Sequence, residues 1–184
     1  MGVMVQCRHH VRFAAAPIRG DRFPPMPPTD TILHPHEAGT ITAPATGWFI
    51  SHGSPMTALQ GGPAGAFMQE LGAKWRAQGR RPKAFLAVSA HTLADELSLL
   101  GAPSHQAIYD FGGFDPKLRT LRYDAPGSPE LAQQVHGLLQ REGFMAQQGP
   151  WSGLDHGLWT PLRYLWPTAD VPVLPLAWNP RMPP

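Results

Sequence analysis

The chain has 184 residues, of which 42% are hydrophobic and 15% are charged, and its formal net charge is +2. This length suits one globular domain, and no basic stripe with interleaved aromatic residues indicates a nucleic-acid-binding surface. No apolar stretch approaches the roughly 20 residues that cross a membrane. The single cysteine, Cys7, excludes an intramolecular disulfide and fits a reducing compartment, so we expect a cytoplasmic protein without nucleic-acid or membrane partners.

The first 45 residues differ in composition from the rest of the chain. Residues 1–45 contain seven prolines and show no sustained hydrophobic period. Proline lacks an amide donor and fixes φ, so we expect this segment to be a disordered extension that forms no sheet ladder. The folded domain is predicted to cover residues 46–184.

Two elements are predicted at the start of this domain. Residues 47–51 (GWFIS) read as a short buried strand. A helix is predicted over 62–79, where Phe67, Leu71 and Trp75 recur every four residues and are expected to form its buried face.

Three further segments are typical of strands. Residues 83–90 are nearly continuously apolar, as expected of a strand covered on both faces, and residues 96–102 are a weaker candidate. Residues 171–178 are also apolar, but Pro172 and Pro175 suggest an edge strand or an irregular one.

Two more helices complete the predicted elements. Residues 128–142 have Ser128 as a suitable N-cap and Gly143 as a stop, and a shorter helix is predicted over 156–166. Strands that alternate with helices predict an α/β fold, with a central mixed or mostly parallel sheet flanked by helices. In such folds the active site is expected at the carboxyl ends of the strands.

Two histidines follow predicted strands. His52 comes directly after residues 47–51, and His91 follows residues 83–90. Two imidazoles that meet at one sheet edge can begin a metal site. The alternative, that each histidine is a hydrogen-bonded turn or core residue, stays open at this point because the two form no local motif.

A third histidine lies in the segment WSGLDHGLWTPL, residues 151–162. His156 is a candidate proton-transfer residue, with Asp155 either orienting its ring or capping the helix that follows. The alternative is that Asp155 only caps the helix and that His156 has no role beyond the first helical turn.

Four blocks together resemble a known family: HGSPM (52–56), AVSAH (87–91), YDFGGFDPKLRTLRYDAPGSPELA (109–132) and GLDHGLWTPLRYLWPTADVPVLPLAW (153–178). In this order they resemble the class III extradiol ring-cleaving dioxygenases, in the branch similar to 4,5-DOPA dioxygenase. The resemblance covers about residues 47–182. It implies an α/β enzyme with non-haem Fe(II) that opens a catechol-type ring, with a small aromatic diol and O₂ as its partners.

The resemblance also implies roles for individual residues. His52 and His91 match metal ligands of the family, and His156 matches a catalytic histidine that acts as a proton donor. Zn²⁺ is expected to replace Fe(II) in purified material, because zinc usually competes well for such ligands. The loop that contains Tyr109, Phe111 and Phe114 is expected either to wall an aromatic substrate or to pack on the core.

The chain also departs from the family pattern. Thr92 follows the second histidine, where the family often has tryptophan. In this branch two more histidines, a metal ligand and a general base, follow the strand at 171–178, and the sequence ends at Pro184 before either. We therefore expect the chain to carry part of the site and to be weakly active or inactive by itself, unless Asp110 or Asp155 supplies the third ligand.

Two other functions remain open at this level. A zinc-dependent hydrolase on the same scaffold would also use two histidines, an acid–base residue and a bound water. A non-catalytic remnant would bind metal weakly or only pack against a partner. A requirement for O₂ separates the dioxygenase from the hydrolase.

Overall fold

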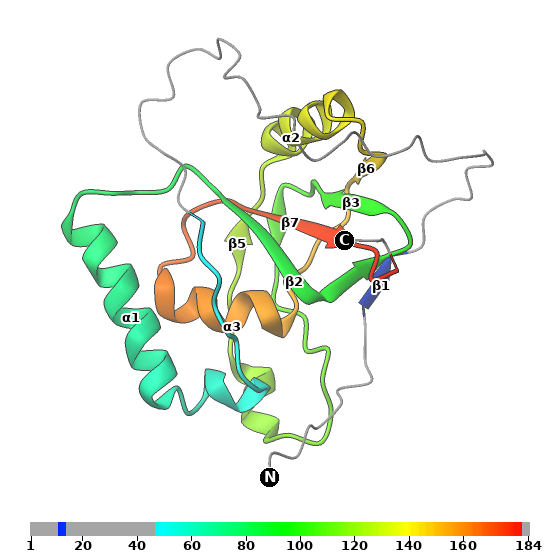
Figure 1. Ribbon diagram of the computed structural model, residues 1–184. Coiled ribbons are helices and arrows are strands. Elements are labelled where there is room, and N and C mark those ends of the chain that lie inside the picture. Colours follow the sequence, from blue (N-terminus) through cyan, green and yellow to red (C-terminus); the bar gives the residue numbers. More distant parts are fainter. Residues whose placement is uncertain (1–10, 14–46, 182–184) are drawn as a thin grey trace. The chain divides into compact units, whose positions relative to one another are not determined.

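Five strands form the sheet on which the molecule is built, in the order β1-β2-β7-β3-β6 (Figure 1). The computed structural model describes residues 11–13 and 47–181. The strands are β1 (Val11–Phe13), β2 (Phe85–Ala94), β3 (Leu97–Leu100), β6 (Ala146–Gly149) and β7 (Val173–Trp178). β2 runs parallel to β1 and β7, β3 runs parallel to β6, and the antiparallel pair β3–β7 joins the two groups. The predicted α/β fold with a mixed, mostly parallel sheet is confirmed.

In the part of the chain that the structure describes, three helices and several short elements accompany this sheet. They are η1 (Pro55–Ala58), α1 (Gly62–Ala77), β4 (Ser104–His105), η2 (Pro116–Thr120), β5 (Ala125–Pro126), α2 (Pro129–Arg141) and α3 (His156–Leu165). α2 begins as predicted, because the Ser128 side chain accepts a hydrogen bond from the Leu131 amide at 3.2 Å. None of the helices in the described part of the chain is long and apolar enough to cross a membrane.

The two faces of β7 contribute to two different parts of the core. Val173 packs in the cluster around Trp159 of α3, whereas the next residue, Leu174, packs with Leu99 of β3 and Ala132 of α2. This alternation follows from the two-residue period of a strand. α3 therefore covers one face of the sheet and α2 covers the other, and all five of these side-chain positions are buried.

The buried face of α1 is not the predicted one. Phe67 is 61% exposed, while Gly65, Met68 and Gly72 are buried. α1 packs on α3 through its glycines: a Cβ atom added at Gly72 would lie 2.0 Å from the backbone oxygen of Leu165. Close approach of two backbones needs small residues, so the glycine positions decide which side of the helix is buried.

Two expectations for the N-terminal part are wrong. Residues 47–51 form no strand, since a run of three apolar residues is equally compatible with an extended loop. Within 1–45, Val11–Phe13 does form a ladder with β2. This tripeptide contains no proline and so keeps its amide donors. The remainder of 1–45, where disorder was expected, lies outside the described residues.

β2 differs from its prediction in two ways. It was expected to be covered on both faces, but Leu86 and Val88 are 54% and 60% exposed because α2 packs on β3 and β6 instead. β2 also extends to Ala94, with a shift of its register against β7 between Val88 and Leu93. Figure 1 shows the strand bending there. His91 therefore lies at an irregularity inside the strand, not at its end.

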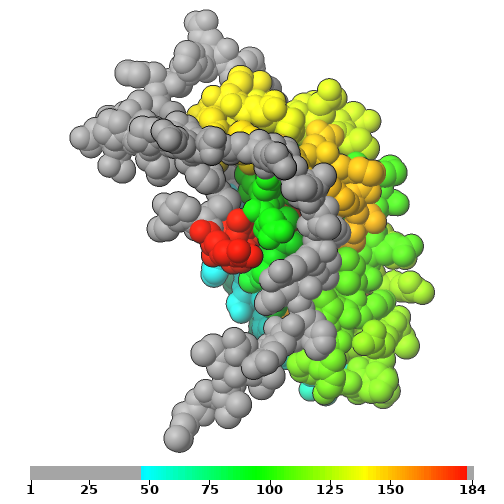
Figure 2. Space-filling view, turned by 90° about the vertical axis from the view of Figure 1, so that its right-hand side faces the viewer, coloured from blue at the N-terminus to red at the C-terminus, as the bar shows by residue number. Residues whose placement is uncertain are grey.

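β7 is a central strand, so the edge-strand alternative that its prolines suggested is wrong, whereas its pairing with β2 does contain an irregularity. It pairs with β2 on one side and with β3 on the other. The pairing with β3 involves Leu176 and Ala177 and leaves Pro175 out, so the missing amide of Pro175 breaks no bond to β3. After β7 the chain contacts the β2–β3 turn, where the side-chain amide of Asn179 donates to the backbone carbonyl of Asp95 at 2.7 Å. Figure 2 shows the end of β7 (red) beside the green residues of this region.

Candidate metal centre

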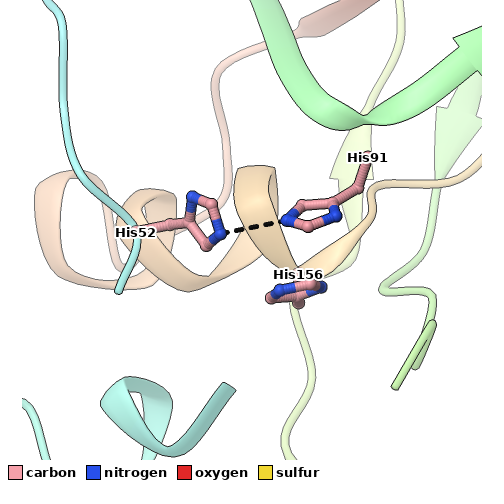
Figure 3. Close-up of side chains that lie close together, drawn as sticks. All are labelled: His52, His91 and His156. Atoms are coloured by element: carbon pink, nitrogen blue, oxygen red, sulfur yellow. Dashed lines mark hydrogen bonds between the residues drawn. The ribbon is translucent and has the colours of Figure 1, made fainter. Parts of the chain in front are cut away.

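Three histidines that are distant in the sequence come together on the α3 side of β2 (Figure 3). The Nε2 atoms of His52 and His91 are 3.1 Å apart. The ring centroid of His156 lies 5.1 Å from that of His52 and 4.2 Å from that of His91. One nitrogen from each ring can be chosen so that all three lie within 4.8 Å of one another. The structure thus brings together the three histidines that the sequence singled out.

Each histidine is positioned by a different element. His52 lies in the loop before η1, where Gly53 adopts a φ of +69° that glycine permits at no steric cost. His91 lies at the register irregularity of β2, and His156 is the first residue of α3. The histidines were expected to meet because each follows the end of a strand. They do meet, but none of the three lies at the end of a regular strand.

Asp155 connects the strand of His91 to the helix of His156. Its carboxylate accepts hydrogen bonds from the hydroxyl of Ser89 at 2.7 Å, from the hydroxyl of Thr92, and from the amide of Gly157 at 2.7 Å. Ser89 in turn accepts the amide hydrogen of His91 at 3.1 Å. Burial raises the pKa of Asp155, despite the hydrogen bonds that oppose this effect. Asp155 therefore caps α3 and does not orient the His156 ring.

Asp110 contacts the His156 ring instead. Both of its carboxylate oxygens lie 3.0 Å from His156 Nδ1, and Oδ1 also accepts the amide hydrogen of His156 at 3.0 Å. Burial alone would raise the pKa of Asp110, but the hydrogen bonds and charge of His156 outweigh it and hold this pKa below its usual value. The acid is ionised at neutral pH and holds the ring from the side of Nδ1.

The electrostatics of the cluster suit a metal ion. Burial, together with the nearby rings of His156 and His91, lowers the pKa of His52 to about 4. His52 is therefore neutral at pH 7 and keeps a lone pair for a cation. Neutral imidazole is a preferred ligand of both Fe(II) and Zn²⁺, so the donor set fits the metals that the sequence implied. Within the described residues, the group of side chains that could hold a metal ion consists of His52, His91 and His156. Asp110 and Asp155 are not in this group, because their carboxylates bind His156 and the Ser89, Thr92 and Gly157 donors.

Residues 46–184 match the family model described as the catalytic LigB subunit of aromatic ring-opening dioxygenase. The chain belongs to this LigB family. It is 41% identical over 134 residues to the 4,5-DOPA dioxygenase extradiol of Beta vulgaris, a match that covers 71% of this chain and 48% of that protein. The protein of the same name from Escherichia coli K12 is 36% identical over 129 residues, which are 70% of this chain and 46% of that protein.

One solved structure agrees with these matches. The crystal structure of an uncharacterized protein from Escherichia coli K12 aligns with a TM-score of 0.51 and 28% sequence identity, covering 66% of this chain and 43% of the other. The chain thus spans about half the length of the LigB-family relatives that it matches.

One aromatic residue of the 109–114 loop, Phe111, lies beside the histidine cluster. Phe111 is buried and its ring meets that of His156 edge-on, with centroids 5.6 Å apart. Tyr109 is half-buried, and its hydroxyl donates to the Leu121 carbonyl at 2.5 Å. The rings of Phe114 and Phe111 meet edge-on, with centroids 5.9 Å apart. These rings pack on the core as one alternative held, and Phe111 also reaches the cluster.

The sequence reasoning missed the partner of His156. Asp110 was considered only as a metal ligand, and Asp155 was the residue expected either to orient the His156 ring or to cap the helix. A signal was present, because Asp110 is an isolated acid in the largely apolar segment AIYDFGGF. A buried carboxylate needs a hydrogen-bonding partner, and an unclaimed histidine elsewhere in the chain is a natural one.

Proposed function

We propose that this chain contributes two metal ligands and a proton donor to an O₂-dependent extradiol cleavage of a catechol-type ring. The observation that carries the proposal is the convergence of His52, His91 and His156 in a chain of the LigB family. In this proposal His52 and His91 bind Fe(II). A bound Fe(II) ion supplies the redox step that lets a catecholate react with O₂.

The residues of the chain would perform the remaining tasks. The ring of His156 stands beside both ligands and delivers a proton to oxygen as the aromatic ring opens. Phe111 closes one side of His156 with an apolar ring and limits the access of water there. Because relatives named 4,5-DOPA dioxygenase extradiol share this segment, DOPA and simple catechol are the substrates to test first.

A second function is favoured by the donor set itself. Three histidine nitrogens within 4.8 Å are the ligands of one class of catalytic zinc site, with a water in the fourth position. A zinc-dependent hydrolase would use His52, His91 and His156 all as ligands. It would work without O₂, which makes the two functions separable in one assay.

The experiment is anaerobic loading of the 184-residue chain with Fe(II), followed by catechol or DOPA and then O₂. We expect slow, iron-dependent O₂ uptake with a yellow ring-opened product, lost in His52→Ala and His91→Ala. The control is His136→Ala, because His136 lies on α2 and its Nε2 is 3.0 Å from the Ala146 oxygen, away from the cluster. Hydrolysis that proceeds with zinc and without O₂ would favour the second function, and a metal that binds the parent chain no better than it binds His52→Ala and His91→Ala would contradict both.

A further inference from the structure

Asp110 binds both the backbone amide and the ring of His156. Its Oδ1 accepts the backbone amide hydrogen of His156, and its two oxygens face Nδ1 of the ring at 3.0 Å each. The side chains of both residues are almost completely buried, at 1% and 2% exposed. Bulk water therefore cannot replace either contact, and the carboxylate has little freedom to turn away.

These contacts decide which ring nitrogen carries hydrogen. An ionised carboxylate has no hydrogen to donate, so the atom that faces it at hydrogen-bond distance must be a donor. Nδ1 is that atom. In a neutral imidazole only one nitrogen bears hydrogen, and Nε2 is then left with its lone pair.

We propose that Asp110 is a positioning residue that fixes the neutral His156 ring as the Nδ1–H tautomer and makes Nε2 the nitrogen that serves the histidine cluster. Asp155 has no such effect, although it is adjacent in sequence and equally buried, because its oxygens bind Ser89, Thr92 and the Gly157 amide.

The consequence for catalysis rests on the proposed function. Proton delivery by His156 begins from the imidazolium, which has hydrogen on both nitrogens. The Nε2–H bond breaks, its electron pair stays on Nε2, and the proton goes to an oxygen of the substrate. The Nδ1–H bond to Asp110 is kept throughout, and Asp110 stays ionised. The same nitrogen then takes up the next proton, so the ring never needs to turn.

The test reads the tautomer directly in the metal-free chain. Long-range ¹H–¹⁵N correlation spectra of the histidine rings at about pH 8.5, where imidazoles are neutral, should show His156 with protonated Nδ1 and unprotonated Nε2. Its signals are assigned by their absence in His156→Gln. A neutral His156 that carries hydrogen on Nε2 would overturn the proposal, and this measurement needs no substitution at Asp110.

Asp110→Asn gives a sharper result. The asparagine keeps one oxygen, which accepts the His156 amide hydrogen and also lies 3.0 Å from Nδ1, while an NH₂ group replaces the second oxygen that faces Nδ1. We expect the tautomer equilibrium to shift toward the form that carries hydrogen on Nε2. Asp155→Asn is the matched control and should leave the tautomer unchanged. A shift toward the Nε2–H tautomer in Asp155→Asn that equals or exceeds the shift in Asp110→Asn would overturn the proposal. Because no metal or substrate is present, the dioxygenase assay can fail independently of this test.

Discussion

Gly72→Ala should destabilise the protein although alanine is the better helix former. Gly72 lies in the middle of α1, where the exchange alone would gain about 1 kcal/mol. The new Cβ atom, however, would lie 2.0 Å from the Leu165 oxygen and 2.8 Å from its carbonyl carbon. These are backbone atoms at the end of α3, so no side-chain rotation relieves the contact.

The size of the effect follows from that geometry. Ordinary van der Waals contact begins at 3.4 Å, so α1 and α3 must separate by more than an ångström at this point. Overpacking of this kind costs about 1–3 kcal/mol, to which the loosened packing of neighbouring core residues adds. Subtracting the gain of about 1 kcal/mol in helix propensity leaves a net loss of about 0–2 kcal/mol, which the loosened packing increases. Because α3 begins at His156, the displacement should also disturb the histidine cluster.

Gly137→Ala is the matched control for this experiment. Gly137 lies inside α2, and a Cβ atom there meets only the flexible end of Arg141 at 3.6 Å. It should gain about 0.5–1 kcal/mol from helix propensity. Urea unfolding followed by far-UV circular dichroism measures both variants against the parent chain. If Gly72→Ala proved as stable as Gly137→Ala, the close approach of α1 and α3 described here would be wrong.

Three further predictions concern the cluster. His156→Ala should lower turnover of the iron-loaded protein by about 10²–10⁴-fold with little change in metal content; a loss of metal with unchanged rate per metal would instead make His156 a ligand. In the metal-free chain, the lowered pKa of His52 contributes stability that is fully present above pH 6.5 and falls as the pH drops from 6.5 toward 4. Thermal unfolding across this pH range should show the loss of stability, and His52→Gln should make that loss smaller. Ser89→Ala removes a bond to buried Asp155 and should cost about 1–3 kcal/mol in urea unfolding, whereas an unchanged midpoint would show that Asp155 does not depend on Ser89.

The elements that the sequence predicted well are those with local signals. α2 begins at the Ser128 cap and ends before Gly143, which has a φ of +81°, as its sequence indicates. α3 likewise begins directly after the Asp155 cap. Capping groups and positive-φ glycines act within a few residues, so they can be recognised without knowledge of the tertiary structure.

The errors concern features that distant residues decide. The buried face of α1 depends on how closely α3 approaches, which the Phe67 periodicity does not encode. The central place of β7 depends on β3 pairing beyond Pro175. The three histidines were candidates from their positions after predicted strands and in the 151–162 segment, and the family resemblance gave them their roles. Asp110 was assigned differently, because its hydrogen bond to His156 joins segments 46 residues apart.

The position of a bound metal ion tests the account most directly. A crystal structure of the chain loaded with Zn²⁺, with the ion located by its anomalous scattering, would give this position. We predict one ion at about 2.0–2.2 Å from an imidazole nitrogen of both His52 and His91, with Asp110 still bonded to Nδ1 of His156. An ion bound elsewhere, or an empty histidine cluster at saturating zinc, would contradict the account.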